Sequence, residues 1–144
     1  MTRSQLREHL FKLIFRVEFN SPEEMPEQLK LYFEDSITDE DIKHVGAEIP
    51  EDEANYVRDR YTSLMDKLPE IDAIINDCAK GWTVERIGKV ELAILRLAVY
   101  ELQFDEAIPT GVAIDEAVDL AKKFGQDGAS AFVNGILAGV AKQK

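Results

Sequence analysis

The sequence predicts an all-α protein of about seven helices, and two observations lead to this class. Apolar residues recur at spacings of three and four along most of the 144 residues, which is the periodicity of one face of a helix. No segment of useful length alternates apolar and polar residues as a half-buried strand does. Proline or glycine separates the periodic segments, as expected at helix ends.

The first helix is expected to begin after Thr2 and to run to about Phe19. Thr2 and Gln5 have the spacing of a capping box, in which each side chain satisfies the other residue's backbone N–H. The apolar residues of one face then form a core stripe: Leu6, Leu10, Leu13, Ile14 and Val17.

Two further helix starts are marked by proline. Ser21 suits an N-cap, Pro22 the first helical position, and Glu24 has capping-box spacing to Ser21. Residues 36–48 are polar and acidic and predict a solvated connection. Pro50, followed by three acidic residues, marks the start of the third helix, where acids are favoured in the first turn.

The second half of the chain predicts four more helices. Pro69 is expected to end the third helix or to begin the fourth. Gly81 is expected to close the fourth helix. Residues 89–102 are apolar on nearly all sides, which is typical of a helix at the centre of a bundle. A helix closed by Gly125 and a final helix follow, and the break near Pro69 predicts two helical subdomains, residues 1–69 and 70–144.

The charge is unevenly distributed. A formal net charge of -11 disfavours a nucleic-acid partner, because a negative protein is repelled by phosphate. Residues 21–55, however, hold twelve acidic and two basic side chains, whereas residues 1–20 hold four basic and two acidic ones. The acidity therefore leaves the first helix locally basic and does not exclude RNA.

Several classes of protein are disfavoured by composition. One cysteine and two histidines are too few for a disulfide framework or a multi-cysteine metal site, and the acidic run lacks the spacing of a calcium loop, so we expect no metal and no cofactor. The absence of any apolar run of about 20 residues, and of a secretory pattern, predicts a cytoplasmic protein without a membrane span. No phosphate-loop or nucleophile motif is present, so we expect no enzyme, and His9 is expected to face solvent or RNA.

The first helix has a second apolar face opposite its core stripe. Phe11, Phe15 and Phe19 lie near 140°, 180° and 220° from Leu6 at 100° per residue. One interpretation is that all three rings are core, and the other is that Phe15 belongs to a partner-binding surface. The two interpretations are compatible if Phe11 is buried and Phe15 is exposed.

Two groups of cations in the second half suggest different roles. Arg96 stands in the apolar segment five residues before Glu101, and we expect it to be buried and paired with a carboxylate, because an unpaired buried charge is costly. Lys122 and Lys123 stand at a helix carboxyl end beside Phe124, and Phe132 follows in the next helix, with a core position as the alternative for at least one of the two rings. Lysines beside exposed aromatic rings suit single-stranded nucleic acid, whose bases stack on the rings.

The second half of the chain contains Trp82, Arg86 and Ile87, the run VELAILRLAVYEL at 90–102, and Ile108-Pro109. VAIDEAVDLAKKFG at 112–125 and FVNGIL at 132–137 follow. In order and spacing these segments resemble the NusB family of transcription antitermination factors, and Arg7-Glu8 followed by Phe15 resembles the family's first helix. The match covers essentially the whole chain, strongly over residues 82–137 and weakly over 21–70.

The resemblance implies a fold of two small helical subdomains and a function. Family members bind a short single-stranded RNA element, boxA, in ribosomal RNA transcripts, together with the small-subunit ribosomal protein NusE, and help to hold RNA polymerase in a termination-resistant complex. By resemblance, the RNA-contacting positions here are Arg3, Arg7, Phe124 and Phe132, and the surface that meets the ribosomal protein includes Phe15 and Glu91.

A second function remains open. Ser4 and Gln5 stand where the family often has further basic residues, which favours RNA binding that depends on the protein partner. The alternative is a purely protein-binding helical adaptor without specific RNA contact. Salt dependence distinguishes the two. A protein that binds RNA displaces counterions from the phosphates, and this displacement becomes less favourable as the salt concentration rises.

Overall fold

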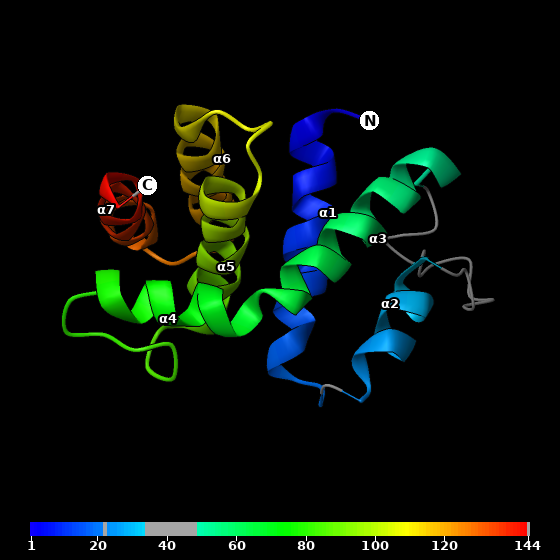
Figure 1. The fold of residues 1–144 in the computed structure, drawn as a ribbon, viewed down its shortest axis with the longest axis horizontal. Helices are drawn as coiled ribbons and strands as arrows, with labels where there is room; N and C mark the ends of the chain where they lie inside the picture. Colours follow the sequence, from blue (N-terminus) through cyan, green and yellow to red (C-terminus); the bar gives the residue numbers. More distant parts are fainter. Residues whose placement is uncertain (22, 34–48, 144) are drawn as a thin grey trace. The chain divides into compact units, whose positions relative to one another are not determined.

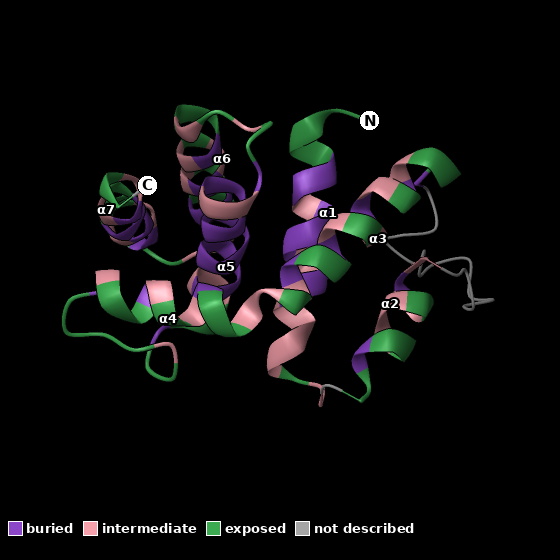
Figure 2. Cartoon of the chain, in the orientation of Figure 1, coloured by how far each residue is buried: buried purple, intermediate pink, exposed green. Residues whose placement is uncertain are grey.

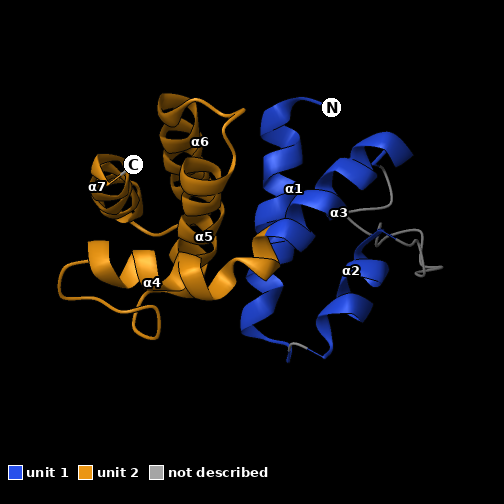
Figure 3. Cartoon of the chain, viewed as in Figure 1, with its two compact units in different colours: residues 1–63 blue, residues 64–144 orange. Residues whose placement is uncertain are grey.

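The computed structural model describes residues 1–21, 23–33 and 49–143, and within them every regular element is a helix (Figure 1). The predicted all-α class is therefore confirmed. The chain divides into two compact units, residues 1–63 and 64–144 (Figure 3). The α-helices of the described residues are α1 (Arg3–Phe15), α2 (Met25–Phe33), α3 (Glu51–Asp66), α4 (Leu68–Cys78), α5 (Lys89–Phe104), α6 (Thr110–Phe124) and α7 (Ala129–Lys142).

Helix α1 begins as expected and ends earlier than expected. The Gln5 amide N–H donates to Thr2 Oγ1 at 3.1 Å and the Thr2 N–H donates to Gln5 Oε1 at 2.8 Å, which confirms the capping box. The α-helix stops at Phe15 and continues as a 3₁₀ turn, Arg16–Glu18. The Asn20 side-chain amide donates to the Arg16 carbonyl at 2.9 Å, which satisfies an acceptor that a longer helix would have used.

Helix α2 begins at Met25, later than the expected start at Pro22, which lies outside the described residues. The Ser21 hydroxyl contacts the Glu24 carboxylate at 3.0 Å, and the Glu24 N–H donates to the Ser21 carbonyl at 2.9 Å. These bonds close a turn before the helix instead of capping it. The connection expected over 36–48 also lies outside the described residues, whereas α3 begins directly after Pro50 as expected.

Side-chain contacts join the three helices of the first unit in pairs. Those between α1 and α2 are a hydrogen bond from His9 to Tyr32 and the Arg16 guanidinium over the Tyr32 ring at 4.9 Å. Arg3 lies over the ring of Tyr56, which joins α1 to α3. Arg58 lies 4.4 Å from the centre of the Phe33 ring, which joins α3 to α2. In three of these contacts an arginine guanidinium lies over an aromatic ring, so cation–π contacts link the helices of this unit.

Helix α5 is the centre of the second unit, and α4, α6 and α7 all pack against it (Figure 1). Every residue from Leu92 to Leu102 is buried, and much of the α5 ribbon is purple in Figure 2. The expectation from the apolar pattern of residues 89–102 is confirmed. Because the middle of α5 is covered on all sides, a binding site of this unit has to lie at the ends of α5 or on the outer helices.

Arg96 is the buried cation of α5, and its partner lies on a different helix. Its Nε and Nη2 donate to the two carboxylate oxygens of Asp72 on α4, at 2.9 and 3.0 Å. The expected pairing with a carboxylate is confirmed, and a bidentate pair of this kind fixes the register of α4 on α5. Glu101 stands five residues on, where two side chains of one helix do not face each other.

No helix in the described part of the chain is both long enough and apolar enough to cross a membrane.

Candidate nucleic-acid interface

The most exposed aromatic side chain of the second unit is Trp82, in the turn between α4 and α5. Gly81 precedes it with φ of +82°, a backbone conformation that favours glycine, and the Trp82 N–H donates to the Ala79 carbonyl at 2.8 Å. The indole is 45% exposed and meets the Phe132 ring of α7 edge to face, with 5.8 Å between the ring centres. The two rings, which come from distant parts of the sequence, form one aromatic pair at the surface.

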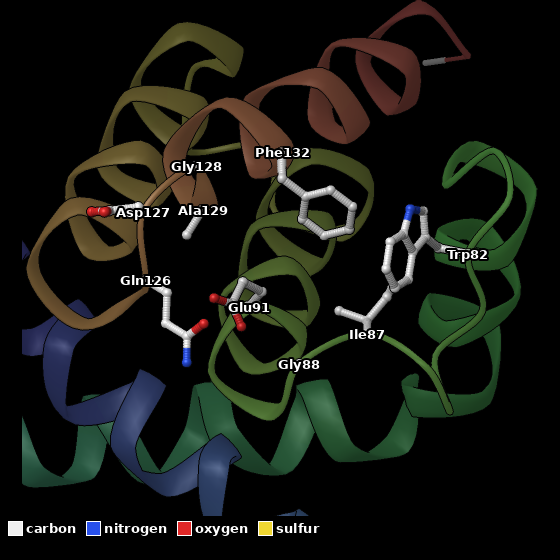
Figure 4. A pocket seen from close by; sticks show the side chains of 9 residues that line it. All are labelled: Trp82, Ile87, Gly88, Glu91, Gln126, Asp127, Gly128, Ala129 and Phe132. Atoms are coloured by element: carbon white, nitrogen blue, oxygen red, sulfur yellow. The ribbon is translucent and has the colours of Figure 1, made fainter.

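A hollow of about 300 Å³ opens beside this pair, between the start of α5 and the loop from α6 to α7 (Figure 4). We call it the Glu91 hollow, after the carboxylate at its centre. In Figure 4 the Trp82 indole and the Phe132 ring face each other at one end, above Ile87. The described residues that line it are Trp82, Ile87, Gly88, Glu91, Gln126, Asp127, Gly128, Ala129 and Phe132.

Two glycines make room for the Glu91 carboxylate. A Cβ atom at Gly88 would lie 2.5 Å from Glu91 Oε2. One at Gly125 would lie 2.6 Å from the Ala129 Cβ and 3.4 Å from Glu91 Oε1. Side chains at these positions would displace the carboxylate or the helix ends around it, so the glycines shape the hollow.

The Glu91 hollow is acidic. Glu91 lies in the first turn of α5 and Asp127 in the loop just before α7, where Gly128, with φ of +85°, precedes the first turn of the helix. Carboxylates are favoured at helix N-termini because the backbone N–H groups there carry partial positive charge. Ionised carboxylates are acceptors only, so this hollow suits amino and guanidinium donors. Among the described residues, no cluster of three or more His, Cys, Asp or Glu side chains has the arrangement of a metal site.

The structure brings two of the expected site residues of the second unit together and keeps two apart. Glu91 and Phe132 line the same hollow. Lys122 is exposed and Phe124 half-buried at the carboxyl end of α6, and neither belongs to the lining. The Lys123 ammonium lies 5.3 Å from the centre of the Phe124 ring, so lysine and aromatic ring do adjoin at this helix end.

The two expected arginines of α1 differ in exposure. Arg3 is exposed, with its guanidinium 4.7 Å from the centre of the Tyr56 ring. Arg7 is only 8% exposed. Arg3 is therefore the α1 arginine whose charge most directly reaches a ligand in solvent.

Phe15 lies in the middle of a row of three rings along the second face of α1. Phe11 is buried, Phe15 is half-buried and Phe19 is 58% exposed. The ring centres of Phe11 and Phe15 are 6.3 Å apart, and those of Phe15 and Phe19 are 5.1 Å apart. Phe11 thus follows the core interpretation, and the row reaches the surface at its far end.

His9 is buried, so the expectation that it faces solvent or RNA is wrong. Its Nδ1 lies 2.6 Å from the Tyr32 hydroxyl, in a hydrogen bond that a purely helical pattern within α1 does not reveal. Burial lowers the pKa of His9, with a further lowering from the nearby Lys12 charge and an opposing effect of Glu8. Burial also raises the pKa of Tyr32, so both groups stay neutral at neutral pH.

The model of the "NusB family" matches residues 4–142, almost the whole chain. The chain belongs to the NusB family. The expected resemblance, over essentially the whole chain, is therefore confirmed.

Close relatives have NusB names and similar lengths. The transcription antitermination protein NusB of Lachnoclostridium phytofermentans is 45% identical over 142 residues, covering 97% of this chain and 98% of the relative. That of Agathobacter rectalis is 44% identical over 138 residues, covering 96% of this chain and 98% of the relative.

Solved NusB structures have the same fold. NusB of T. maritima superposes with a TM-score of 0.78 at 32% identity, covering 99% of this chain and 92% of that one. A complex described as antitermination factors NusB and NusE with double-stranded RNA contains a chain with a TM-score of 0.72 at 28% identity, covering 99% of this chain and 97% of that one.

Sequence reasoning used Trp82 for the NusB resemblance and assigned it no place in a site. The available signal was a lone tryptophan directly after a glycine, in a turn between two helices. Its pairing with Phe132 joins residues 50 positions apart, which the local pattern does not contain.

Proposed function

We propose that this protein is a non-enzymatic transcription antitermination factor. In this proposal it binds boxA-type single-stranded RNA in ribosomal RNA transcripts, together with the small-subunit ribosomal protein NusE. The pair would join the antitermination complex on RNA polymerase in the cytoplasm. The observation that carries the proposal is the similarity of this chain, over 99% of its length, to a chain in the solved complex of NusB and NusE with double-stranded RNA.

The RNA-binding residues in this proposal are Arg3, Arg7, Lys122, Phe124 and Phe132. The exposure of Arg3 and Lys122 and the partial exposure of the two rings support it, because phosphates need accessible cations and bases need accessible ring faces. The Lys123 ammonium beside the Phe124 ring at the end of α6 adds to this support.

The residues proposed to meet NusE are Phe15 and Glu91. The row of rings that ends at the exposed Phe19 supports an apolar contact, because large exposed apolar side chains mark protein interfaces. The acidity of the Glu91 hollow supports a contact with lysine or arginine side chains, which are abundant in proteins that bind ribosomal RNA.

The central experiment is a titration of fluorescently labelled boxA-type RNA with this protein, with and without NusE, over a salt series. We expect NusE to strengthen binding, and the logarithm of the RNA binding constant to fall linearly with the logarithm of the salt concentration. A duplex of the same sequence serves as a second probe, and we expect it to bind more weakly than the single strand. Salt-independent or absent RNA binding, with NusE binding intact, would instead support the protein-binding adaptor.

The contribution of α1 to RNA binding is tested with Arg3→Ala. Loss of one phosphate contact should lower the steepness of the salt dependence by about 0.7 for a single strand. Arg7→Ala is measured beside it with a thermal melt, because removal of a buried side chain also affects folding. If the Arg3→Ala/Arg7→Ala double variant keeps its fold and its RNA affinity at low salt, the assignment of these arginines to RNA binding is wrong.

The NusE contact is tested with Phe15→Asp, and Phe19→Asp, at the exposed end of the same row of rings, serves as a comparison for the effect on folding. We expect Phe15→Asp to weaken NusE binding at least tenfold and to leave the helical circular dichroism spectrum unchanged. If Phe15→Asp unfolds the protein while Phe19→Asp does not, Phe15 belongs to the core and the partner surface lies elsewhere.

A further inference from the structure

A second hollow, of about 480 Å³, lies next to the Glu91 hollow along α7. The two share Trp82 and Phe132 in their linings, so the aromatic pair forms a ridge between them. The second hollow extends from this ridge over the end of α4 and the outer side of α7, and its rim includes Lys80 and Lys142. We call it the Lys80 hollow.

The two hollows are opposite in charge. The described residues that line the Glu91 hollow include two carboxylates, Glu91 and Asp127, and no cation. Those that line the Lys80 hollow include two lysines and no carboxylate. The protein as a whole is strongly acidic. A hollow whose charged lining residues are both lysines is therefore a local exception, and it favours an anionic occupant.

Small residues give the Lys80 hollow its width. A Cβ atom at Gly135 would meet nothing within 4 Å, and one at Gly139 would only touch the Cys78 Cβ at 3.8 Å. Ala131 and Ala138 complete the α7 side. This side of the hollow therefore has short, apolar side chains next to two aromatic rings, which leaves room for a flat ring system.

Trp82 is well suited to stack on such a ring. It is 45% exposed, and the Arg86 guanidinium lies 5.8 Å from the centre of its ring. Stacking of a nucleobase on an exposed aromatic ring is favourable with any base, and a nearby arginine adds to it.

We propose that the Lys80 hollow is a second nucleotide subsite, which continues the RNA path beyond Phe132. One base stacks on Trp82, and Lys80 and Lys142 hold the phosphates that flank it. This inference rests on the proposed RNA-binding function and deepens it, because it assigns Trp82, Lys80 and Lys142 to the RNA. The positive charge favours RNA over NusE as the occupant, because a cationic ribosomal protein fits the acidic hollow better.

A purely structural role of the lysines is the competing explanation. Lys80 follows the end of α4, and Lys142 lies in the last turn of α7, where cations interact favourably with the helix dipole. That role predicts a loss of stability on removal of the lysines, whereas the subsite predicts a loss of RNA affinity at unchanged stability.

Tryptophan fluorescence tests the stacking directly, because Trp82 is the only tryptophan in the chain. The full-length protein is titrated with unlabelled boxA-type RNA in the presence and absence of NusE, and a parallel titration of Trp82→Phe supplies the background from NusE. We expect RNA to quench the Trp82 emission at the same concentrations at which labelled RNA binds. Trp82→Ala should weaken RNA binding about tenfold, and Trp82→Phe, which keeps a ring, much less.

The phosphate contacts are tested with the Lys80→Ala/Lys142→Ala double variant. The charge-matched control is Lys30→Ala/Lys67→Ala, because neither of these lysines lines the Glu91 hollow or the Lys80 hollow. We expect the first double variant to lower the steepness of the salt dependence by about 1.4, as two phosphate contacts on a single strand require, and the control to leave it unchanged. Thermal melts of both variants should match the unmodified protein.

The outcomes separate this inference from the proposed function. RNA binding with unchanged Trp82 emission, or with the same salt dependence in both double variants, overturns the subsite and leaves the proposed function standing. Loss of NusE binding in the Lys80→Ala/Lys142→Ala double variant at unchanged stability also overturns it, since the Lys80 hollow would then be a protein interface. If RNA binds under no condition, the proposed function fails, and the subsite fails with it.

Discussion

Helices α5 and α1 are both apolar on more than one side, yet they are buried to very different degrees. All residues from Leu92 to Leu102 of α5 are buried between the three helices packed around it. On α1 the second apolar face begins with Phe11, which is 4% exposed, and the row of rings continues beyond the helix to Phe19, which is 58% exposed.

The difference shows what an apolar pattern does and does not establish. It identifies side chains that gain free energy when they leave water, but it does not identify what covers them. In α5 the covering elements belong to the same unit. The row of rings at α1 leads from the core to an exposed ring, which is the reason to look for a partner there.

The largest expected effect tests this contrast directly. Leu95 on α5 is fully buried, so Leu95→Ala should lower the free energy of unfolding by about 4 kcal/mol through lost transfer energy and a cavity. Phe19→Ala should change it by no more than about 0.5 kcal/mol, because the exposed ring has little burial to lose. Urea denaturation measures both, and equal losses would remove the distinction between the two helices.

Breaking the ion pair between Arg96 on α5 and Asp72 on α4 should give the next largest loss of stability. Arg96→Ala removes the partner of Asp72 and should cost about 3 kcal/mol in a urea titration, the lower end of the usual range because the Asp72 side chain is 23% exposed. The Arg96→Met/Asp72→Leu double variant should recover much of this loss, since an apolar pair needs no desolvation of charge. If Arg96→Ala costs no more than the exposed Arg86→Ala, the pair contributes nothing.

Gly125, at the end of α6, tests how tightly the residues near Glu91 are packed. Gly125→Ala should destabilise the protein by about 2 kcal/mol, because the added methyl would lie 2.7 Å from the Ala121 carbonyl oxygen and as close to the Ala129 side chain. Gly111→Ala, at a position of α6 with open space, should instead stabilise by about 0.5 kcal/mol through helix propensity. Thermal melts of the two variants should therefore move in opposite directions.

The smallest expected effect concerns α1 and is a dependence on pH. Because the pKa of His9 is lowered in the folded protein, the unfolded chain takes up the proton more readily, and stability should fall as pH drops below about 6.5. One such group can contribute a slope of at most about 1.4 kcal/mol per pH unit. Urea titrations between about pH 6 and 7.5, where carboxylates stay ionised, should show this slope, and His9→Gln should flatten it. A slope that persists in His9→Gln would assign the effect to another group.

Local signals in the sequence predicted most of the fold. The Thr2–Gln5 capping box, the start of α3 after Pro50 and the buried character of α5 each depend on residues close together in the chain, and each is present as expected. Helix α2 begins later than expected, because Ser21 and Glu24 bond to each other in a turn before the helix.

The contacts that define the site are long-range, and the sequence did not predict them. The burial of His9 depends on Tyr32, the partner of Arg96 is Asp72, and the surface position of Trp82 depends on Phe132. Each pair joins two helices or a helix and a turn, and periodicity within one segment has no access to such pairs. The family resemblance, in contrast, depends on the order and spacing of residues, and it did select Glu91 and Phe132, which share a hollow.

The wall of the Lys80 hollow also contains Cys78, the only cysteine of the chain, at the end of α4. Burial raises the pKa of this thiol, and the negative charge of Asp77 raises it further. Alkylation by iodoacetamide requires the thiolate, so the reaction at neutral pH is slow. An occupant of the hollow would slow it again, and the rate of alkylation therefore makes Cys78 a built-in chemical footprint of whatever binds there.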